Sequence, residues 1–291
     1  MNLLCFGCGY VAQNFAKLIL SKGGTVTGTT RDVANFKSLK YQGIYPLIFK
    51  VDQLLDREIL KSFTHILISI PPNQNGDIVI PKQFQDFESL PNLKWLGYLS
   101  TTGVYGNHHG EWVTEVSPCT PTQARSQIRL QAEEAWWNLW KQQSIPVHIF
   151  RLSGIYGPHR NVFEQIREGT AQRIHKPGQV FSRIHVEDIA VTLFASALNP
   201  RPGEIYNLAD DEPAATSDVI SYACRLLGVE PPRLIPFEEG QLSPMAQGFY
   251  AENKRVSNRK IKQDLNINLL YPTYREGLKS MVDTYKAEGV S

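Results

Sequence analysis

The chain has 291 residues, of which 42% are hydrophobic and 20% are charged, and its formal net charge is +2. The length suits one α/β unit with a smaller appended lobe, and the composition is typical of a globular protein. Because positive and negative residues are both spread along the chain, we expect neither a nucleic-acid partner nor a membrane surface.

No apolar run in the sequence is long enough to cross a bilayer, and the first apolar segment is too short for a signal peptide. The four cysteines are widely scattered, which favours a reducing compartment, so we expect a cytoplasmic protein. Cys5 and Cys8 have C-x-x-C spacing, but neither a second such pair nor a histidine pair follows them. We therefore predict no metal site.

Apolar, β-prone runs alternate with helical patterns through the first half of the chain. We expect strands over residues 2–6, 25–30, 44–51, 64–70, 93–100 and 147–152, and helices over 11–21, 55–62 and 124–142. These strands are too apolar to have one face in water. The pattern predicts an α/β fold, in which a doubly wound parallel sheet is covered by helices on both sides.

The pattern changes after residue 154. We expect helices over 161–169, 188–198, 218–227, 259–264 and 274–287, and strands over 180–186 and 205–208. Asp188 is typical of a helix N-cap, and Gly228 of a helix end. We predict a Rossmann dinucleotide-binding core over 1–157 and a C-terminal substrate-binding lobe over 158–291, with segments at about 180–210 returning to the core.

A glycine-rich motif of the G-x-G-x-x-A type follows the first strand and opens a helix: Gly7, Cys8, Gly9, Tyr10, Val11 and Ala12. Gly7 permits the tight turn, Gly9 lets the backbone approach a pyrophosphate, and Ala12 keeps the helix close to the sheet. The N-terminus of the helix attracts the phosphates. The motif predicts dinucleotide binding, and the alternative is a glycine-rich turn without a ligand.

The end of the second strand indicates which dinucleotide is bound. Sites selective for NAD usually hold the ribose 2′-hydroxyl with an acidic residue there, whereas this chain has Thr30 and Arg31. Arg31 can hold a 2′-phosphate and stack on adenine, so we expect NADP in preference to NAD. A solvated loop arginine is the alternative, because Asp32 is adjacent. Asp52, after the third strand, can reach the adenine or cap the following helix.

Two further strand ends are expected beside the cofactor. Ser69, Ile70 and Pro71 end the fourth strand, and a strand end beside a proline turn is the alternative interpretation. Ser100 and Leu152 end the strands that follow, and we place both among the cofactor-binding residues. This expectation rests on the rule that ligands bind at the carboxyl ends of the strands in open α/β sheets.

Three longer motifs follow the glycine turn, and they spell Ser-Thr-Thr-Gly-Val-Tyr-Gly at 100–106, Arg-Leu-Ser-Gly-Ile-Tyr-Gly-Pro at 151–158 and Phe-Ser-Arg-Ile-His-Val-Glu-Asp-Ile-Ala at 181–190. With these motifs the chain resembles the extended short-chain dehydrogenases/reductases, in the NAD-dependent epimerase/dehydratase superfamily. The resemblance covers residues 1 to about 210, and the last two motifs most resemble a YeeZ-like bacterial subgroup. The final eighty or so residues match only loosely.

The resemblance implies how the reacting end of the site is built. In this superfamily a Ser or Thr before Val-Tyr-Gly hydrogen-bonds the reacting oxygen, which implies Thr101, with Thr102 as the near alternative. The family also places a Tyr and a Lys four residues apart on the next helix, where this chain has Arg125 and Arg129. Arginine has a pKa above about 12, so it does not exchange protons near neutrality.

The two arginines permit other roles. Arg129 can hold the ribose hydroxyls, and Arg125 can clamp a carboxylate or phosphate with two hydrogen bonds. Two solvated arginines on a surface helix are the alternative. Tyr105 is a further catalytic candidate, since it follows a strand, although tyrosines at this position are often structural.

A second group of residues is expected to bind the substrate. Arg160, Arg183 and His185 are on segments that should converge with Arg125 near the reactive end of the cofactor, and Tyr156 follows a strand there. Three arginines with a histidine would suit an anionic ligand. Arginine-rich surfaces without a ligand are the alternative.

We therefore predict an NADP-binding oxidoreductase-type protein that acts on a small molecule, for which an anion is the favoured class. The alternative is a catalytically silent, NADP-responsive binding protein, since the Tyr-Lys pair is missing. Trp136, Trp137 and Trp140 lie on the helix of Arg125. Core packing is the first interpretation of these side chains, and a homodimer through this helix is the second.

Overall fold

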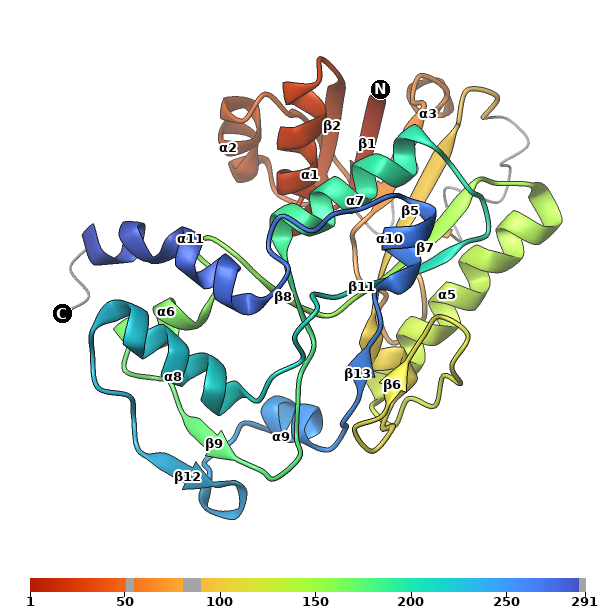
Figure 1. Cartoon of the computed structure of the whole chain (residues 1–291). Helices are drawn as coiled ribbons and strands as arrows, with labels where there is room; N and C mark the ends of the chain where they lie inside the picture. Colours follow the sequence, from red (N-terminus) through yellow and green to blue (C-terminus); the bar gives the residue numbers. More distant parts are fainter. Residues whose placement is uncertain (51–54, 81–89, 288–291) are drawn as a thin grey trace.

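The computed structural model describes residues 1–50, 55–80 and 90–287 (Figure 1). Its centre is a seven-stranded sheet in the order β11-β7-β5-β4-β1-β2-β3, and every neighbouring pair of strands is parallel. The strand bounds are β1 Asn2–Phe6, β2 Thr25–Thr30, β3 Tyr45–Ile48, β4 His65–Ile68, β5 Trp95–Thr101, β7 Val147–Leu152 and β11 Ile205–Leu208. The predicted parallel Rossmann sheet is confirmed.

The register of the sheet brings the carboxyl ends of its strands to one edge. Thr101, the last residue of β5, lies opposite Leu152 of β7, and Leu152 in turn lies opposite Leu208 of β11. Because all strands run in the same direction, this edge is the carboxyl end of the whole sheet. A ligand crevice is expected along such an edge.

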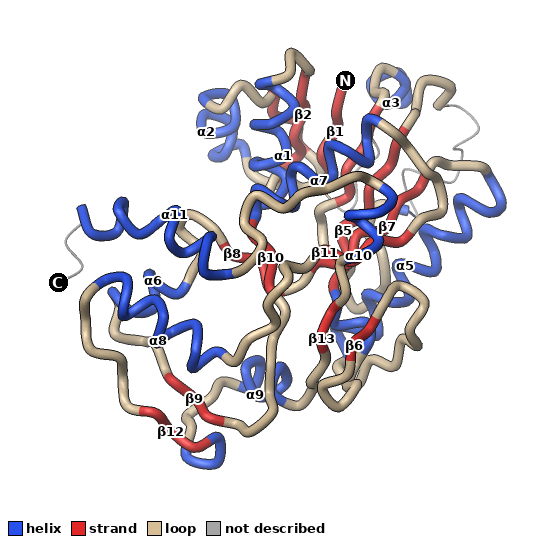
Figure 2. Tube along the Cα trace, in the orientation of Figure 1, coloured by secondary structure: helices blue, strands red, loops and turns tan. Residues whose placement is uncertain are grey.

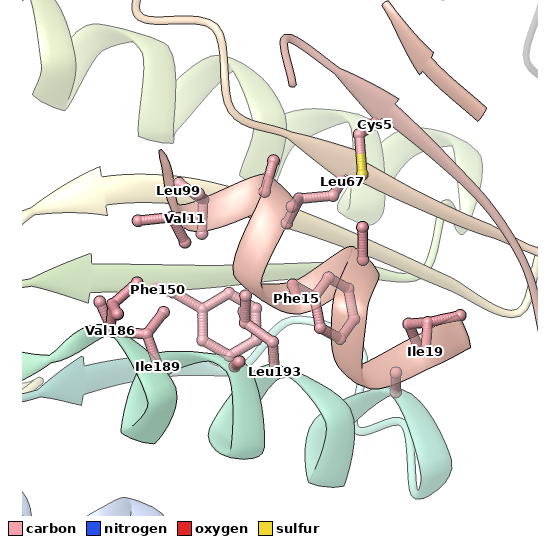
Figure 3. Close-up of a cluster of buried hydrophobic side chains, with 14 of the residues drawn as sticks. Cys5, Val11, Phe15, Ile19, Leu67, Leu99, Phe150, Val186, Ile189 and Leu193 are labelled. Carbon is pink, nitrogen blue, oxygen red and sulfur yellow. The ribbon is translucent and has the colours of Figure 1, made fainter. Parts of the chain in front are cut away.

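Helices cover both faces of the sheet. On one face α1 (Tyr10–Ser21) packs beside α7 (Val186–Leu198), and Phe15, Ile19, Ile189 and Leu193 belong to one buried cluster with Phe150 of β7 (Figure 3). All five side chains are buried, with at most 1% of their surface exposed. The apolar positions recur at helical spacing, which is why these segments form amphipathic helices rather than strands.

The other face is covered by α5 (Ala124–Gln143). Trp136 is fully buried and its ring lies 6.0 Å from that of Tyr98 in β5. Trp137 donates a hydrogen bond to the carbonyl of Gly203, at 3.3 Å, and Trp140 packs against the same glycine. Gly203 has a φ of +87°, and a Cβ there would lie 2.5 Å from the Trp140 ring. The tryptophans therefore pack within the chain, as the first interpretation predicted.

The C-terminal lobe lies beyond the carboxyl edge of the sheet, and Figure 2 shows it as mostly helix and loop. Its helices are α6 Val162–Arg167, α8 Thr216–Leu227, α9 Pro244–Tyr250 and α11 Tyr274–Ala287. Its short parallel strand pairs are β8 Gly154–Tyr156 with β10 Arg183–His185, and β9 Arg173–His175 with β12 Leu234–Pro236. Phe163, Ala223 and Leu278 join three of these helices in one apolar cluster.

Smaller elements complete the fold. Their bounds are α2 Phe36–Tyr41, α3 Arg57–Lys61, β6 Trp112–Val113, β13 Arg255–Val256 and α10 Arg259–Asp264. The strands β6 and β13 form a two-stranded parallel pair. No helix in the described ranges is both long and apolar enough to pass through a membrane.

The start of α7 differs from the prediction. His185, and not Asp188, is the N-cap, and its Nδ1 accepts a hydrogen bond from the amide of Glu187 at 3.3 Å. The Asp188 carboxylate instead accepts hydrogen bonds from the amides of Leu270, at 2.6 Å, and Tyr271, at 3.1 Å. These two hydrogen bonds connect the segment at Leu270 and Tyr271 to α7 of the core.

Candidate functional site

The turn between β1 and α1 has the shape that the glycine motif predicted. Gly7 has a φ of +81°, and a Cβ there would lie 2.6 Å from the Ile70 side chain at the end of β4. Its amide donates a hydrogen bond to the hydroxyl of Thr29, at 2.8 Å. At Gly9, in contrast, a Cβ would meet no described atom within 4 Å. The turn is therefore tight at Gly7 and open at Gly9.

The first turn of α1 leaves its amides available to an anion. The N-cap is Gly9, and in the described part of the chain no side chain caps the helix and no acidic residue stands in its first turn. A helix of 12 residues has a partial positive charge at this end. Because Gly9 is the N-cap, the open space beside it adjoins this first turn, and the residues present fit the pyrophosphate of a dinucleotide.

The other residues of the motif support the turn. Val11 and Ala12 are buried against the sheet. The Cys8 sulfur lies beside Gly28 of β2, where a Cβ would be only 2.8 Å away, and burial raises the pKa of the Cys8 thiol to about 11. The Tyr10 hydroxyl donates a hydrogen bond to the carbonyl of Pro158, at 2.9 Å. Cys8 is thus a neutral packing residue, and Tyr10 connects the turn to the lobe.

At the end of β2, the Asp32 carboxylate and the Arg31 guanidinium have different surroundings. The Asp32 carboxylate accepts a hydrogen bond from the amide of Ala34, at 2.9 Å, and so caps the short helical turn that follows. The Thr30 hydroxyl accepts from the side-chain amide of Asn35, at 3.0 Å. Arg31 is exposed at the same strand end. The Arg31 side chain is therefore accessible to a ligand, whereas the Asp32 carboxylate is hydrogen-bonded to the backbone.

The end of β4 lies against the glycine turn. The amides of Ser69 and Ile70 both donate to the carbonyl of Phe6, at 2.9 and 3.1 Å, and the Ile70 side chain touches Gly7. Pro71 is exposed immediately after them. This places the three predicted residues beside the turn. Asp52, which was also predicted to reach the cofactor, lies outside the described residues.

Thr101 and Thr102 stand where β5 ends. The Thr101 hydroxyl accepts a hydrogen bond from the amide of Gly103, at 3.1 Å, and Thr101 is partly exposed. Its O–H remains able to donate to a substrate oxygen. Thr102 is 9% exposed, and its hydroxyl donates to the carbonyl of Leu152 at 3.4 Å. Of the two hydroxyls, that of Thr101 is the better placed to reach a ligand.

The two arginines of α5 have different surroundings. Arg129 is half-buried and donates a hydrogen bond to the carbonyl of Leu99, at 2.7 Å, beside the end of β5. Arg125 is exposed, and its guanidinium lies 4.3 Å from the centre of the Phe249 ring, in α9 of the lobe. Arg129 therefore lies at the carboxyl edge of the sheet, whereas Arg125 contacts the lobe.

Two predicted site residues belong instead to a buried network. The Ser100 hydroxyl donates to Glu133, and the Tyr105 hydroxyl donates to Asn207 at 2.7 Å while accepting from Arg151 at 3.0 Å. Tyr105 has no exposed surface, and burial raises its pKa to about 12. Both hydroxyl groups are engaged in the interior, so their surroundings do not support the predicted catalytic role of Tyr105 or the predicted cofactor contact of Ser100. Leu152 is likewise a core residue.

The arginines that were predicted to surround the substrate have separate contacts. Arg183 donates to the carbonyls of Phe181, at 2.8 Å, and Ala214, at 2.9 Å, so it holds lobe segments together. Arg160 lies 5.8 Å from the centre of the Tyr10 ring, beside the glycine turn. Arg125, Arg160 and Arg183 each contact different residues. Their contacts therefore do not bring the three arginines together in one pocket.

His185 and Tyr156 are interior residues as well. His185 is 1% exposed, and burial lowers its pKa to about 4, so it is neutral near pH 7. Its ring lies 5.1 Å from that of Tyr156, which is 7% exposed and whose pKa burial raises. A Cβ at Gly277 would lie 2.1 Å from the Tyr156 hydroxyl, so Tyr156 packs closely on α11. Neither side chain is presented to a ligand.

A cavity of about 370 Å³ lies in the lobe, and sequence reasoning missed it. Three basic side chains line it, Lys176, Arg255 and Arg275, with two acids, Glu212 and Asp218. Arg275 and Glu212 form an ion pair at 2.8 Å, so their charges offset each other and leave Lys176 and Arg255 against Asp218. The first residues of α8 also face the cavity, and within the described chain no side chain caps this helix. The lining therefore favours an anion.

Residues 89–209 match the NAD dependent epimerase/dehydratase family. "Protein YeeZ" of Escherichia coli K12 is 25% identical over 239 residues, which are 78% of this chain and 84% of that protein. A conserved protein of Silicibacter pomeroyi, described as functionally unknown, is 43% identical, with a TM-score of 0.90 and 99% of each chain covered.

The dTDP-glucose 4,6-dehydratase of Bacillus anthracis, solved in complex with NAD, has a TM-score of 0.79 at 20% identity, covering 99% of this chain and 97% of that one. The fold, the glycine turn and these matches define a Rossmann-type α/β protein. The part of the chain that matches the NAD dependent epimerase/dehydratase family is residues 89–209, and the chain is similar to YeeZ over most of its length.

Proposed function

We propose that the protein is an NADP-dependent oxidoreductase that takes a small anionic substrate into the lobe cavity. The observation that carries the proposal is the open space at Gly9 in front of the uncapped first turn of α1. This arrangement supports a pyrophosphate at the glycine turn, and the bound nicotinamide would supply hydride chemistry at the carboxyl edge of the sheet.

The preference for NADP is supported by the end of β2. An NAD-selective site needs a free carboxylate for the ribose 2′-hydroxyl, but the Asp32 carboxylate caps the turn at Ala34. Arg31 is exposed beside it and can form charge-assisted hydrogen bonds with a 2′-phosphate. Arg160, near the Tyr10 ring, adds a second cation close to the turn.

The substrate class is supported by the lobe cavity. Its bases outnumber its acids, and the N-terminal turn of α8 adds a partial positive charge. The similar dehydratase from Bacillus anthracis is named for dTDP-glucose, whose diphosphate is an anion. A nucleotide-linked sugar or another phosphate ester therefore suits the cavity. In this arrangement Thr101 would donate a hydrogen bond to the substrate oxygen.

A catalytically silent, NADP-responsive binding protein is the second candidate. The Tyr and Lys positions both hold arginine, and Arg129 is engaged with the carbonyl of Leu99. Neither arginine can exchange a proton near neutrality. The two candidates share the cofactor and differ in whether bound NADPH is consumed.

The test is a side-by-side titration of the protein with NADPH and NADH. We expect NADPH to bind at least tenfold more tightly, and the Arg31→Ala variant to lose about tenfold in NADPH affinity, since one charge-assisted hydrogen bond contributes about 1.5–3 kcal/mol. Arg233→Ala, which removes an exposed arginine of the lobe, is the matched control. Equal affinities for the two cofactors would overturn the NADP preference, and binding of neither would overturn the proposed function.

A second measurement separates the two candidates. Oxidation of NADPH is followed by absorbance in the presence of keto acids, keto-sugar phosphates and nucleotide-linked keto sugars. Turnover with any of these that falls in Thr101→Val supports the oxidoreductase. Tight NADPH binding without turnover, together with a partner affinity that depends on the redox state of the cofactor, would support the binding protein.

A further inference from the structure

The helix α9 stands between the lobe cavity and the first turn of α5. Tyr250, its last residue, lines the cavity and is 7% exposed. The Tyr250 ring lies 5.1 Å from that of Phe181 and 5.3 Å from that of Phe237, and its carbonyl accepts a hydrogen bond from Lys176. One end of α9 is thus part of the cavity wall.

The residue before Tyr250 contacts the core instead. Phe249 is 53% exposed, and the guanidinium carbon of Arg125 lies 4.3 Å from the centre of its ring. At Gly248 a Cβ would lie 3.0 Å from the side-chain oxygen of Gln123, which precedes α5. Glycine is unfavourable inside a helix, so its presence in α9 fits a need for close approach to α5. The two helices therefore meet at Phe249 and Gly248.

The segment after α9 is also attached to the core. Glu252 accepts a hydrogen bond from the hydroxyl of Thr122, at 3.2 Å, and pairs with Lys254 at 2.8 Å. Lys254 donates to the carbonyl of Gly106, at 2.7 Å. Gly106 follows the strand end that holds Thr101, so the segment after α9 connects the cavity wall to the carboxyl end of β5.

We infer that Arg125 is a positioning residue that holds α9 against the core through Phe249 and so keeps the Tyr250 wall of the cavity in place. This inference rests on the proposed function, in which the cavity binds the substrate. It differs from the sequence prediction, because Arg125 acts through α9 and does not contact the ligand. Arginine suits the role because its planar guanidinium stacks on a ring, and its charge persists at every physiological pH.

The first experiment measures hydrogen–deuterium exchange of residues 244–250 in the full chain without ligands, so its result does not depend on the proposed function. We expect Arg125→Ala and Phe249→Leu each to raise the exchange rate of these amides about two- to fivefold, as an exposed cation–π contact predicts. Phe249→Tyr keeps the ring and should exchange like the parent, as should the control Arg233→Ala. Unchanged exchange in Arg125→Ala would overturn the inference.

The second experiment is a double-mutant cycle on ligand affinity, with dTDP-glucose as the probe and NADPH present. We expect each single variant to weaken binding of dTDP-glucose by a similar factor, and the double variant to bind no more weakly than either one. NADPH affinity should not change. Additive losses, with Arg125→Ala the larger, would show direct contact between Arg125 and the ligand and overturn the inference. If the parent protein binds NADPH but not the probe, dTDP-glucose is excluded as the substrate, and the exchange experiment still tests the contact.

Discussion

Arg151 of β7 and Glu133 of α5 form a buried bidentate ion pair. Both side chains are at most 5% exposed, and the Arg151 Nη2 lies 2.8 Å from Glu133 Oε2 while its Nε donates to both carboxylate oxygens. The pair joins the sheet to the helix that carries Arg125 and Arg129. Ser100 and Tyr105 complete its hydrogen bonds.

Removal of one charge from this pair should destabilise the whole protein. We expect Glu133→Gln to lower the free energy of unfolding by about 3–5 kcal/mol, because it leaves the buried Arg151 charge without its counterion. The measurement is equilibrium urea unfolding. Glu134→Gln, at the neighbouring exposed position, is the control and should change the free energy by less than about 0.5 kcal/mol. Equal small changes in both variants would argue against the pair.

Tyr105→Phe tests whether that tyrosine is structural. The variant removes the hydroxyl that bridges Arg151 and Asn207. We expect the free energy of unfolding to fall by about 1–3 kcal/mol, since buried groups lose a partner, while NADPH affinity stays within about twofold. Any NADPH turnover should also persist at low temperature, where the variant is folded. Loss of turnover with unchanged stability would return Tyr105 to the catalytic candidates.

Gly7 and Gly9 should respond differently to substitution. A side chain at Gly9 meets open space, so Gly9→Val should fold normally and lose at least tenfold in NADPH affinity, because it occupies the pyrophosphate position. Gly7→Ala places a Cβ on a backbone with φ +81° and against Ile70, which should cost about 1–2 kcal/mol of stability or more. Thermal unfolding and NADPH titration of both variants separate the two effects. Undiminished NADPH affinity in Gly9→Val would place the cofactor elsewhere.

Asp210 should make stability fall as the pH rises. It is 1% exposed, and burial raises its pKa to about 8, against an ordinary value of 3.8. Between these two pH values the folded chain holds a proton that the unfolded chain has released, so the free energy of unfolding decreases from about pH 4 to pH 8 and is then level. Each pH unit in this window should cost about 1.4 kcal/mol at most.

The matched variants for this effect are Asp210→Asn and Asp283→Asn. Asparagine at 210 does not titrate, so the decrease between pH 4 and 8 should become smaller in that variant. Asp283 is exposed in α11, and its substitution should leave the pH profile unchanged. The profile is measured by urea unfolding at each pH. A profile of Asp210→Asn that follows the parent at every pH would contradict the assignment.

The central sheet could be predicted because the residue pattern of each strand is recognisable within its own short segment. Most of its strands are short apolar runs bounded by a helix or turn, because burial on both faces makes such runs continuous in sequence, and β2 is marked by β-branched threonine and valine. The lobe strands β9 and β12 have three residues each, so no periodicity marks them. The helix α9 was missed for a similar reason, since its seven residues include one proline and one glycine.

The glycine turn could also be predicted, because one continuous motif builds it. The buried network could not, since Ser100 and Glu133 are 33 positions apart and only folding brings them together. The lobe cavity is likewise formed by segments near residues 176, 212 and 255. Motifs gave the positions of Tyr105 and His185 along the chain, but burial decides which polar groups a ligand can reach, and burial depends on distant residues.

The late position of β11 (Ile205–Leu208) in the sequence affects how the central sheet folds while the chain is being synthesised. This strand pairs with β7, yet more than fifty residues, which include both lobe segments and α7, separate the two strands in sequence. Until residue 208 has been synthesised, β7 is an open edge of apolar residues, which is a surface that invites aggregation. A fragment cut after residue 157 therefore lacks an outer strand of its own sheet, and the nucleotide-binding half cannot be separated from the lobe by truncation.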